Sequence, residues 1–227
     1  MKLTSLALIA ALFSLNVRAE LPTELTVSSF DVYEVPVTAE DKAQLPLLLA
    51  EPDPGLGTVI AVARQLVALG EVLYPLIKRG QPEVTTQFAP INVLPVDPAT
   101  GRNADPFMME RAGRPATKKF IGSIKNGLGM EVVRLEFLAH YSPGASFEGK
   151  GKYLQNAMIV PSKIWATWGW DVTATMRLLS ISNQGTRTQP IAAAVLQMNY
   201  TVRNLISHVE KNHLVEINGL GEMIVTE

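Results

Sequence analysis

Apolar and polar side chains alternate over residues 164–181, and no other feature constrains the fold of this chain as strongly. The apolar positions are Trp168, Trp170, Val172, Ala174, Met176 and Leu178, and the polar positions between them are Thr167, Asp171, Thr173, Thr175 and Arg177. A period of two residues is the repeat of a β-strand, because successive side chains point to opposite faces of a sheet. We therefore expect one long strand here, with one face in a hydrophobic core and the other in solvent.

Residues 118–227 are predicted to form long antiparallel strands joined by tight turns. Short groups of Asn, Gly, Ser and Pro separate the alternating runs, and such residues favour hairpin turns. The predicted strands span residues 119–124, 130–141, 152–160, 164–181 and 191–202, with a terminal hairpin of 213–217 and 222–225, and the predicted turns are Asn126-Gly127, Ser142-Pro143-Gly144, Asn183-Gln184-Gly185 and Asn218-Gly219. Residues 205–209 fit either a helical turn or a strand.

Residues 25–117 are predicted to hold the other strands, one helix and a long loop. A strand over 25–37 is ended or confined to a sheet edge by Pro36, because proline has no N–H to donate to a neighbouring strand. A proline-rich loop follows through 51–55. Residues 57–78 predict the one long helix, since their apolar side chains cover a broad arc opposite a narrow polar side.

Two more segments complete this part of the chain. Residues 83–96 predict an extended strand that its prolines confine to an edge, and residues 97–117 predict a long loop, the segment that we expect to move most. The whole pattern predicts a mainly β fold of the α+β class. We expect an antiparallel, β-sandwich-like arrangement of about seven or eight strands, packed with one long N-terminal helix.

The first 19 residues have the three-part layout of a secretory signal peptide. Lys2 precedes a ten-residue apolar run, and Val and Ala stand at the −3 and −1 positions of a cut after Ala19. The apolar run is too short to cross a bilayer, which takes about 20 residues. We expect cleavage after Ala19 and export of residues 20–227, as a single globular domain, to the periplasm or the extracellular space.

Composition narrows the partners and the means of stabilisation. The chain has no cysteine, so neither a disulfide nor a lipidated cysteine is available and the core alone has to stabilise the exported domain. Without Lys2 and Arg18, 18 basic residues face 21 acidic residues, a net charge of −3 that disfavours nucleic acid and anionic membrane surfaces as partners. No later segment has about 18 consecutive apolar residues, so no integral membrane insertion is expected.

No motif in the chain reaches the level of a catalytic or cofactor signature. Residues 144–151 match the phosphate-binding pattern GxxxxGK, but Gly151 stands where Ser or Thr must hold magnesium, so we interpret them as a glycine-rich hairpin turn. His208 and His213 lack a zinc-binding spacing and are interpreted as surface residues, as is His140. We predict no catalytic residue, no metal site and no cofactor, and we leave enzymatic activity open with a preference against it.

Two groups of apolar residues are the candidates for binding. These candidates are Trp168, Trp170, Phe107, Met108 and Met109. The two tryptophans share one predicted sheet face, on which they either belong to the core or form an exposed platform for sugars or an extended peptide. We prefer the core, because that face continues with apolar residues, whereas Trp165 points to the other face. The other three candidates form an apolar island in the 97–117 loop, which either packs under the sheet or meets a partner.

Two functions of different classes remain. The first is a non-enzymatic envelope or secreted protein that binds another protein through a sheet edge or through the 97–117 loop. The second is a carbohydrate-binding module or a cell-wall glycan hydrolase, which rests on the tryptophans and on scattered acidic residues. A membrane-active protein built from β-hairpins is a minor third alternative. The sequence identifies neither the partner nor the oligomeric state.

Overall fold

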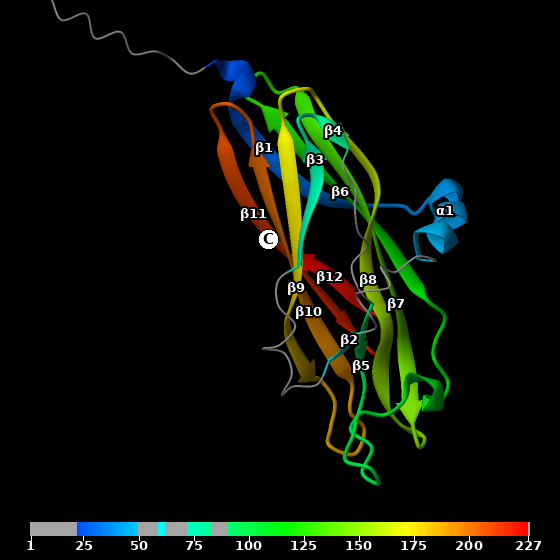
Figure 1. Cartoon of the computed structure of the whole chain (residues 1–227). Coiled ribbons are helices and arrows are strands. Elements are labelled where there is room, and N and C mark those ends of the chain that lie inside the picture. The colour runs from blue at the N-terminus through cyan, green and yellow to red at the C-terminus, as the bar shows by residue number, and fades with distance from the viewer. Residues whose placement is uncertain (1–21, 50–58, 62–71, 83–89, 227) are drawn as a thin grey trace, which may run out of the picture.

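The computed structural model describes residues 22–49, 59–61, 72–82 and 90–226, which form two β-sheets that face each other (Figure 1). The first sheet has the strand order β1-β6-β7-β8-β5-β2, and the second has the order β12-β11-β10-β9-β3-β4. Neighbouring strands are antiparallel except for the parallel pair of β2 and β5. The predicted mainly β, sandwich-like fold of the α+β class is confirmed. The predicted signal peptide, residues 1–19, lies outside the described residues.

The strands differ widely in length. The first sheet contains β1 (Val27–Val35), β6 (Ala116–Asn126), β7 (Glu131–Phe147), β8 (Lys150–Ala166), β5 (Ile91–Val93) and β2 (Val59–Ala61). The second sheet contains β12 (Met223–Thr226), β11 (His208–Asn218), β10 (Ala192–Arg203), β9 (Asp171–Asn183), β3 (Val72–Lys78) and β4 (Gln81–Pro82). The helical segments among the described residues are α1 (Ala39–Leu49) and the 3-10 turns η1 (Thr23–Leu25) and η3 (Pro106–Met108).

Side chains from both sheets fill the space between the layers. Phe30 of β1 and Phe137 of β7 contact Tyr200 of β10, with ring centroids 5.2 and 5.8 Å apart. Burial raises the pKa of the Tyr200 phenol, which lies fully inside this core. Each large apolar side chain that is fully buried stabilises a fold by about 1.5–3 kcal/mol relative to exposure. The shared core therefore holds the two sheets together.

The helix predicted over 57–78 is wrong wherever the structure describes that segment. Residues 59–61 form β2 and residues 72–78 form β3, while residues 62–71 lie outside the described residues. A short apolar run fits a buried strand as well as a buried helix, so its pattern alone does not separate the two. Pairing decides here, because β2 lies beside β5 and β3 lies beside β9.

The α-helix that the described residues do contain lies where the sequence predicted no element. Thr38 precedes α1 and forms a capping box with Asp41: the Asp41 amide donates to the Thr38 hydroxyl at 3.2 Å, and the Thr38 amide donates to the Asp41 carboxylate at 2.8 Å. Pro46 stands inside the helix, and this proline conceals the helical pattern. The Thr-x-x-Asp spacing was the signal that could have found α1.

Three strand boundaries also differ from the prediction. The strand expected over 164–181 is divided, because β8 ends at Ala166 and β9 begins at Asp171, with a turn between them. The turn expected at 142–144 lies inside β7, where irregular pairing with β8 accommodates a proline that cannot donate to the sheet. The edge strand expected over 83–96 appears only as β5, which lies between β8 and β2, and residues 83–89 lie outside the described residues.

Other predicted elements are confirmed. β1 is an edge strand that ends just before Pro36, and Asn126-Gly127 begins the turn between β6 and β7. β10 covers the strand predicted over 191–202, and β11 and β12 form the terminal hairpin through Asn218-Gly219. Residues 204–207 form a turn before β11 begins at His208.

Candidate binding surfaces

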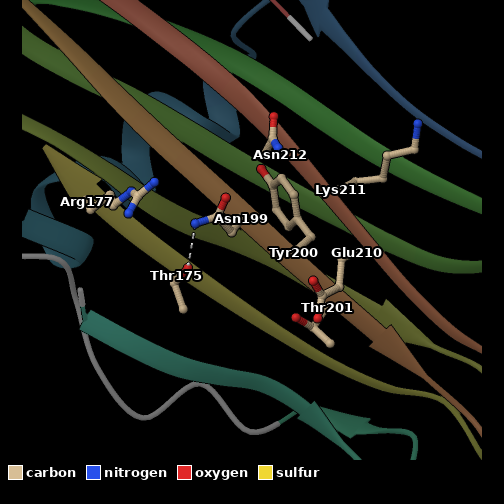
Figure 2. A pocket seen from close by; sticks show the side chains of 8 residues that line it. All are labelled: Thr175, Arg177, Asn199, Tyr200, Thr201, Glu210, Lys211 and Asn212. Carbon is tan, nitrogen blue, oxygen red and sulfur yellow. Dashed lines mark hydrogen bonds between the residues drawn. The ribbon is translucent and has the colours of Figure 1, made fainter. Parts of the chain in front are cut away.

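A polar hollow lies on the outward face of the second sheet, over β9, β10 and β11 (Figure 2). Its volume is about 580 Å³, within the range of natural ligand sites. The residues around it are Thr175, Arg177, Asn199, Tyr200, Thr201, Glu210, Lys211 and Asn212. Amides, hydroxyls, one guanidinium and one carboxylate therefore meet on a rigid sheet surface, as a hydrogen-bonding ligand requires.

Neighbouring side chains hold the polar groups of this hollow in place. The Arg177 Nε donates to the Gln197 Oε1 at 2.6 Å, and the Asn199 Nδ2 donates to the Thr175 Oγ1 at 3.2 Å. Figure 2 shows Asn199 beside Thr175, while Lys211 extends away from both. The Tyr200 ring is buried in the core, so it offers no stacking surface to a ligand in the hollow. Binding there would depend on hydrogen bonds and charge, without aromatic stacking.

The structure separates the tryptophans that the sequence placed on one face. Trp170 is 3% exposed and belongs to the core, as preferred, whereas Trp168 is 88% exposed, contrary to the preference for burial. The reason is the turn over residues 167–170, where Gly169 has a φ of 88° and interrupts the alternation. A platform made of Trp168 and Trp170 together is therefore absent, although Trp168 alone remains accessible.

Four connections and the N-terminal turn meet at one end of the sandwich, which we call the tryptophan end. It comprises residues 22–26, 78–81, 125–131, 165–171 and 203–208. The carbonyl of Thr23 accepts from the Gly127 amide at 3.0 Å, and the carbonyl of Leu25 accepts from the Asn204 and Ser207 side chains at 2.6 Å. These bonds join η1 to the connections at 125–131 and 203–208.

Two further contacts bring the turn that carries Trp168 into the tryptophan end. The Thr167 amide donates to the Val132 carbonyl at 2.8 Å, and the Gly80 amide donates to the Trp170 carbonyl at 3.0 Å. A Cβ on Gly80 would lie 2.6 Å from the Trp168 Cα, so this position requires glycine. The backbone of the Trp168 turn is thereby held between two neighbouring connections.

Large apolar side chains are exposed at the tryptophan end. They are Leu128, Met130, Trp165, Trp168 and Leu205, with exposed fractions that run from 45% at Trp165 to 90% at Leu205. Of these, the sequence analysis considered only the tryptophans. The available signal was an apolar residue inside a turn motif, because Leu128 follows Asn126-Gly127 and Leu205 follows Asn204.

The 97–117 loop carries its apolar island at the opposite end of the sandwich. Phe107 is 95% exposed and Met108 is also exposed, while Met109 is half-buried, so Phe107 does not pack under the sheet. Glu110 pairs with Ser146 near the β7–β8 hairpin. Because β7 runs for 17 residues between the two ends, a distance on the order of 50 Å separates this island from Trp168. The two groups of candidates do not form one site.

The histidines and the GxxxxGK segment are distributed over separate places. Glu148 and Gly149 have φ of 49° and 71° and connect β7 to β8, which confirms the hairpin turn. His208 is exposed and pairs with Glu210 at 3.0 Å, as expected for the surface. His213 is buried against the rings of Phe30 and Tyr200, so its surface interpretation is wrong. No group of three or more potential metal ligands occurs among the described residues.

His140 is half-buried, which corrects the prediction that it is exposed. Its Nδ1 lies 2.9 Å from the Thr117 hydroxyl on the neighbouring strand β6. Burial lowers the pKa of this imidazole below its ordinary 6.5. We therefore interpret the contact between neutral His140 and Thr117 as a structural hydrogen bond between neighbouring strands.

Ionised groups lie buried between α1 and the outward face of the first sheet. The Lys119 Nζ lies 2.7 Å from the Asp41 Oδ1 and 2.8 Å from the Glu136 Oε2, and Glu136 also pairs with Arg134 at 3.0 Å. Burial alone would raise the pKa of both carboxyls. The combined effect of the hydrogen bonds and charges around them, from Lys119 and Thr38 at Asp41 and from Lys119 and Arg134 at Glu136, lowers it instead. Burial likewise opposes the charge of Lys119, whose bonds to the carboxylates nevertheless raise its pKa. This cluster attaches α1 to the sheet.

No protein-family model, no curated protein and no solved structure matches this chain. No helix among the described residues has the length and apolar character needed to span a membrane.

Proposed function

We propose that this chain is an exported, non-catalytic binding protein of the cell envelope or the extracellular space, which pairs the free edge of β1 with a strand of a protein partner. β1 has nine residues and pairs only with β6 among the described strands. The other strands at sheet edges, β2, β4 and β12, have three, two and four residues. A long free edge offers a row of N–H and C=O groups to a partner strand.

The titratable groups with shifted pKa values support a role without catalysis. Asp41 and Glu136 both pair with Lys119 beneath α1, and Glu136 also pairs with Arg134. Burial raises the pKa of Tyr141 to about 12, and its hydroxyl lies 3.0 Å from the carbonyl of Glu222, to which it donates. None of these groups lines the polar hollow of the second sheet, and their contacts stabilise the fold.

Hydrogen exchange with the partner bound tests the β1 proposal. The exported protein, immobilised, is used to isolate a partner from an extract of its own cell envelope, and exchange is then compared with and without that partner. We expect the amides of residues 27–35 to become protected while those of the central strand β10 do not change. Protection that leaves β1 unchanged and appears elsewhere would contradict edge pairing.

Two lysine variants provide a matched comparison. Asp31→Lys with Tyr33→Lys places charges on exposed positions of β1, where edge lysines block strand addition, so we expect partner capture to fall at least about tenfold. Val195→Lys with Thr201→Lys places two lysines on half-exposed positions of β10 and is expected to retain capture. Equal capture by both variants would rule out the β1 edge.

Carbohydrate binding is a second candidate function, and the polar hollow of the second sheet favours it. Its amides, hydroxyls, guanidinium and carboxylate match the hydroxyl groups of a sugar, although no aromatic ring stacks there. Soluble peptidoglycan fragments and neutral oligosaccharides are the probes, with binding measured by titration calorimetry. We expect Arg177→Ala with Asn212→Ala to abolish binding and Thr186→Ala, in a distant connection, to leave it unchanged. If no probe binds the native protein, this candidate is rejected.

A further inference from the structure

We propose that the tryptophan end docks peripherally on an anionic lipid surface. The exposed side chains of Leu128, Met130, Trp165, Trp168 and Leu205 provide apolar contact, and exposed cations around them provide attraction to acidic headgroups. This surface is separate from the β1 edge to which the partner protein is assigned.

The apolar residues of this end stand on three turns and on the end of β8. Trp168 lies between β8 and β9, Leu205 lies between β10 and β11, and Met130 lies between β6 and β7. Each turn is tied to its neighbours by backbone or side-chain hydrogen bonds. Tryptophan favours the interface between headgroups and acyl chains, and exposed leucine at the same level gains by leaving water. The turns thus expose apolar side chains on a backbone that hydrogen bonds hold in place.

Cations at the tryptophan end are largely free of acidic partners. Lys78, Arg79, Lys125 and Arg203 are exposed, and none forms an ion pair with a described carboxylate.

Of the three carboxylates of this end, one forms an ion pair, and the hydrogen bond to a second one does not neutralise its charge. Glu131 accepts from Ser123 at 2.6 Å and pairs with Arg134, and Asp171 accepts from the Arg79 amide. Glu24 is the remaining carboxylate of this end. Free cations therefore outnumber free carboxylates around the exposed apolar side chains.

Local charge, and not the net charge of the chain, governs such docking. The Debye length is about 8 Å at physiological ionic strength, so charges at the far end of the sandwich do not reach a surface that touches this end. The net charge of −3 expected for residues 20–227 therefore does not exclude an anionic membrane, contrary to the expectation from composition.

The shape of this end favours a lipid surface over a protein. An apolar anchor that binds a protein fills a complementary pocket, and the exposed residues of one interface share one packed surface. Here the side chains project from three turns and from the end of β8, and the polar hollow lies away from them, over β9, β10 and β11. A bilayer accepts scattered side chains because its interface adapts to them.

Vesicle binding by the exported form of the protein, purified from producing cells, is the test. The probes are vesicles of phosphatidylcholine and vesicles in which about a third of the lipid is phosphatidylglycerol. We expect co-sedimentation with the anionic vesicles, a shift of tryptophan emission to shorter wavelength, and loss of binding at high salt. Trp170 is buried and does not contribute to the shift, so the signal reports on Trp165 and Trp168.

Two pairs of variants assign this binding to the tryptophan end. Trp168→Ala with Leu205→Ala is expected to weaken binding at least about tenfold, and the pair Phe107→Ala with Met108→Ala, equally exposed at the other end, leaves it unchanged. Lys125→Glu with Arg203→Glu is expected to weaken anionic binding at least about tenfold, whereas Arg102→Glu with Arg187→Glu does not. All these side chains are exposed, and circular dichroism checks that each variant is folded.

Three results would overturn the proposal. In the first, the native protein binds neither type of vesicle. In the second, the variants of both ends weaken vesicle binding equally. In the third, Trp168→Ala with Leu205→Ala loses capture of the partner protein but still binds vesicles normally. The last result would make this end a protein interface. The Asp31→Lys, Tyr33→Lys variant of β1 should bind vesicles normally, so failure of the edge proposal and failure of the lipid proposal remain distinguishable.

Discussion

The outward faces of the two sheets differ, although both sheets contribute their inward faces to one core. On the first sheet, outward-pointing Ile121, Leu138 and Val160 are buried, and Lys119 lies in the ion cluster beneath α1. On the second sheet, outward-pointing positions such as Gln197 are half-exposed, and the polar hollow opens to solvent. A covered outward face acts as a second layer of core, whereas an open one is available for binding.

Lys119→Met should have the largest effect on this difference. The substitution leaves Asp41 and Glu136 buried without their shared cation, and breaking a buried ion pair in this way costs about 3–5 kcal/mol of unfolding free energy. Urea denaturation at neutral pH measures the loss. Lys118→Met is the control, because its pair with Glu34 is largely exposed and such pairs contribute about 0–1 kcal/mol. Equal losses in the two variants would show that α1 is not anchored by the cluster.

Truncation of one leucine on each outward face gives the next largest contrast. Leu138→Ala removes a fully buried side chain from the first sheet and should lower the unfolding free energy by about 2–5 kcal/mol. Leu179→Ala removes an exposed side chain from the second sheet and should change it by less than about 0.5 kcal/mol. Similar values from thermal or urea unfolding would mean that the two outward faces do not differ in burial.

The pH dependence of stability should sharpen the same contrast. The pKa values of Asp41 and Glu136 lie below their ordinary 3.8 and 4.5, so the unfolded chain binds more protons in this range. Their contribution to the free energy of unfolding is fully present above these ordinary pKa values and is lost as the pH falls through the lowered ones.

The raised pKa of Lys119 gives the cluster its upper limit. Its contribution is present below the ordinary value of 10.5 and is lost as the pH rises through the raised pKa. Urea midpoints measured against pH should therefore be insensitive to the cluster between these limits. The deficit of Lys119→Met should shrink below pH 4.5, where protonation removes the unpaired charges. A deficit that is constant with pH would contradict this account.

The smallest effect is expected on the open face. Arg177→Ala removes an exposed guanidinium bonded to Gln197 and should change the unfolding free energy by less than about 0.5 kcal/mol. Arg134→Ala is the matched change on the first sheet, where the guanidinium pairs with the buried Glu136, and it should cost more. Urea denaturation measures both changes. A larger loss of unfolding free energy for Arg177→Ala than for Arg134→Ala would show that the residues of the polar hollow stabilise the fold.

Strand positions could be predicted where alternation was strong and turn residues were distinctive. β1, β6, β10 and the β11–β12 hairpin were found in this way. β2 and β3 were assigned to a helix because their apolar side chains fit a broad helical arc, which does not separate a buried helix from buried strands. α1 was missed because Pro46 concealed its helical pattern and the capping-box spacing before it was not used. The sequence also contained an unused signal for the covered outward face of the first sheet. Leu138 is an apolar residue at an outward position between Glu136 and His140, which indicates that this face is covered.

The candidate sites were predictable only in part. Trp168 was singled out from its residue type, but a turn at Gly169, and not the strand pattern, decides that it is exposed while Trp170 is buried. Leu205 and Met130 lie at the same end of the sandwich, where η1 joins their connections through hydrogen bonds, and no local pattern indicates this arrangement. The ion cluster joins residues from α1, β6 and β7, and no local pattern indicates such a meeting.

By itself the sequence determined that this chain forms a β-sandwich-like fold with an apolar interior, because a period of two fixes which side chains share a face. Tertiary structure alone decided which outward face is covered and which apolar residues are left exposed. The physical reason is that the repeat of two is set by neighbouring residues of one strand, whereas the burial of an outward face depends on segments far apart in the chain that pack against it. Thus α1 covers Lys119 of β6, while nothing among the described residues covers Trp168.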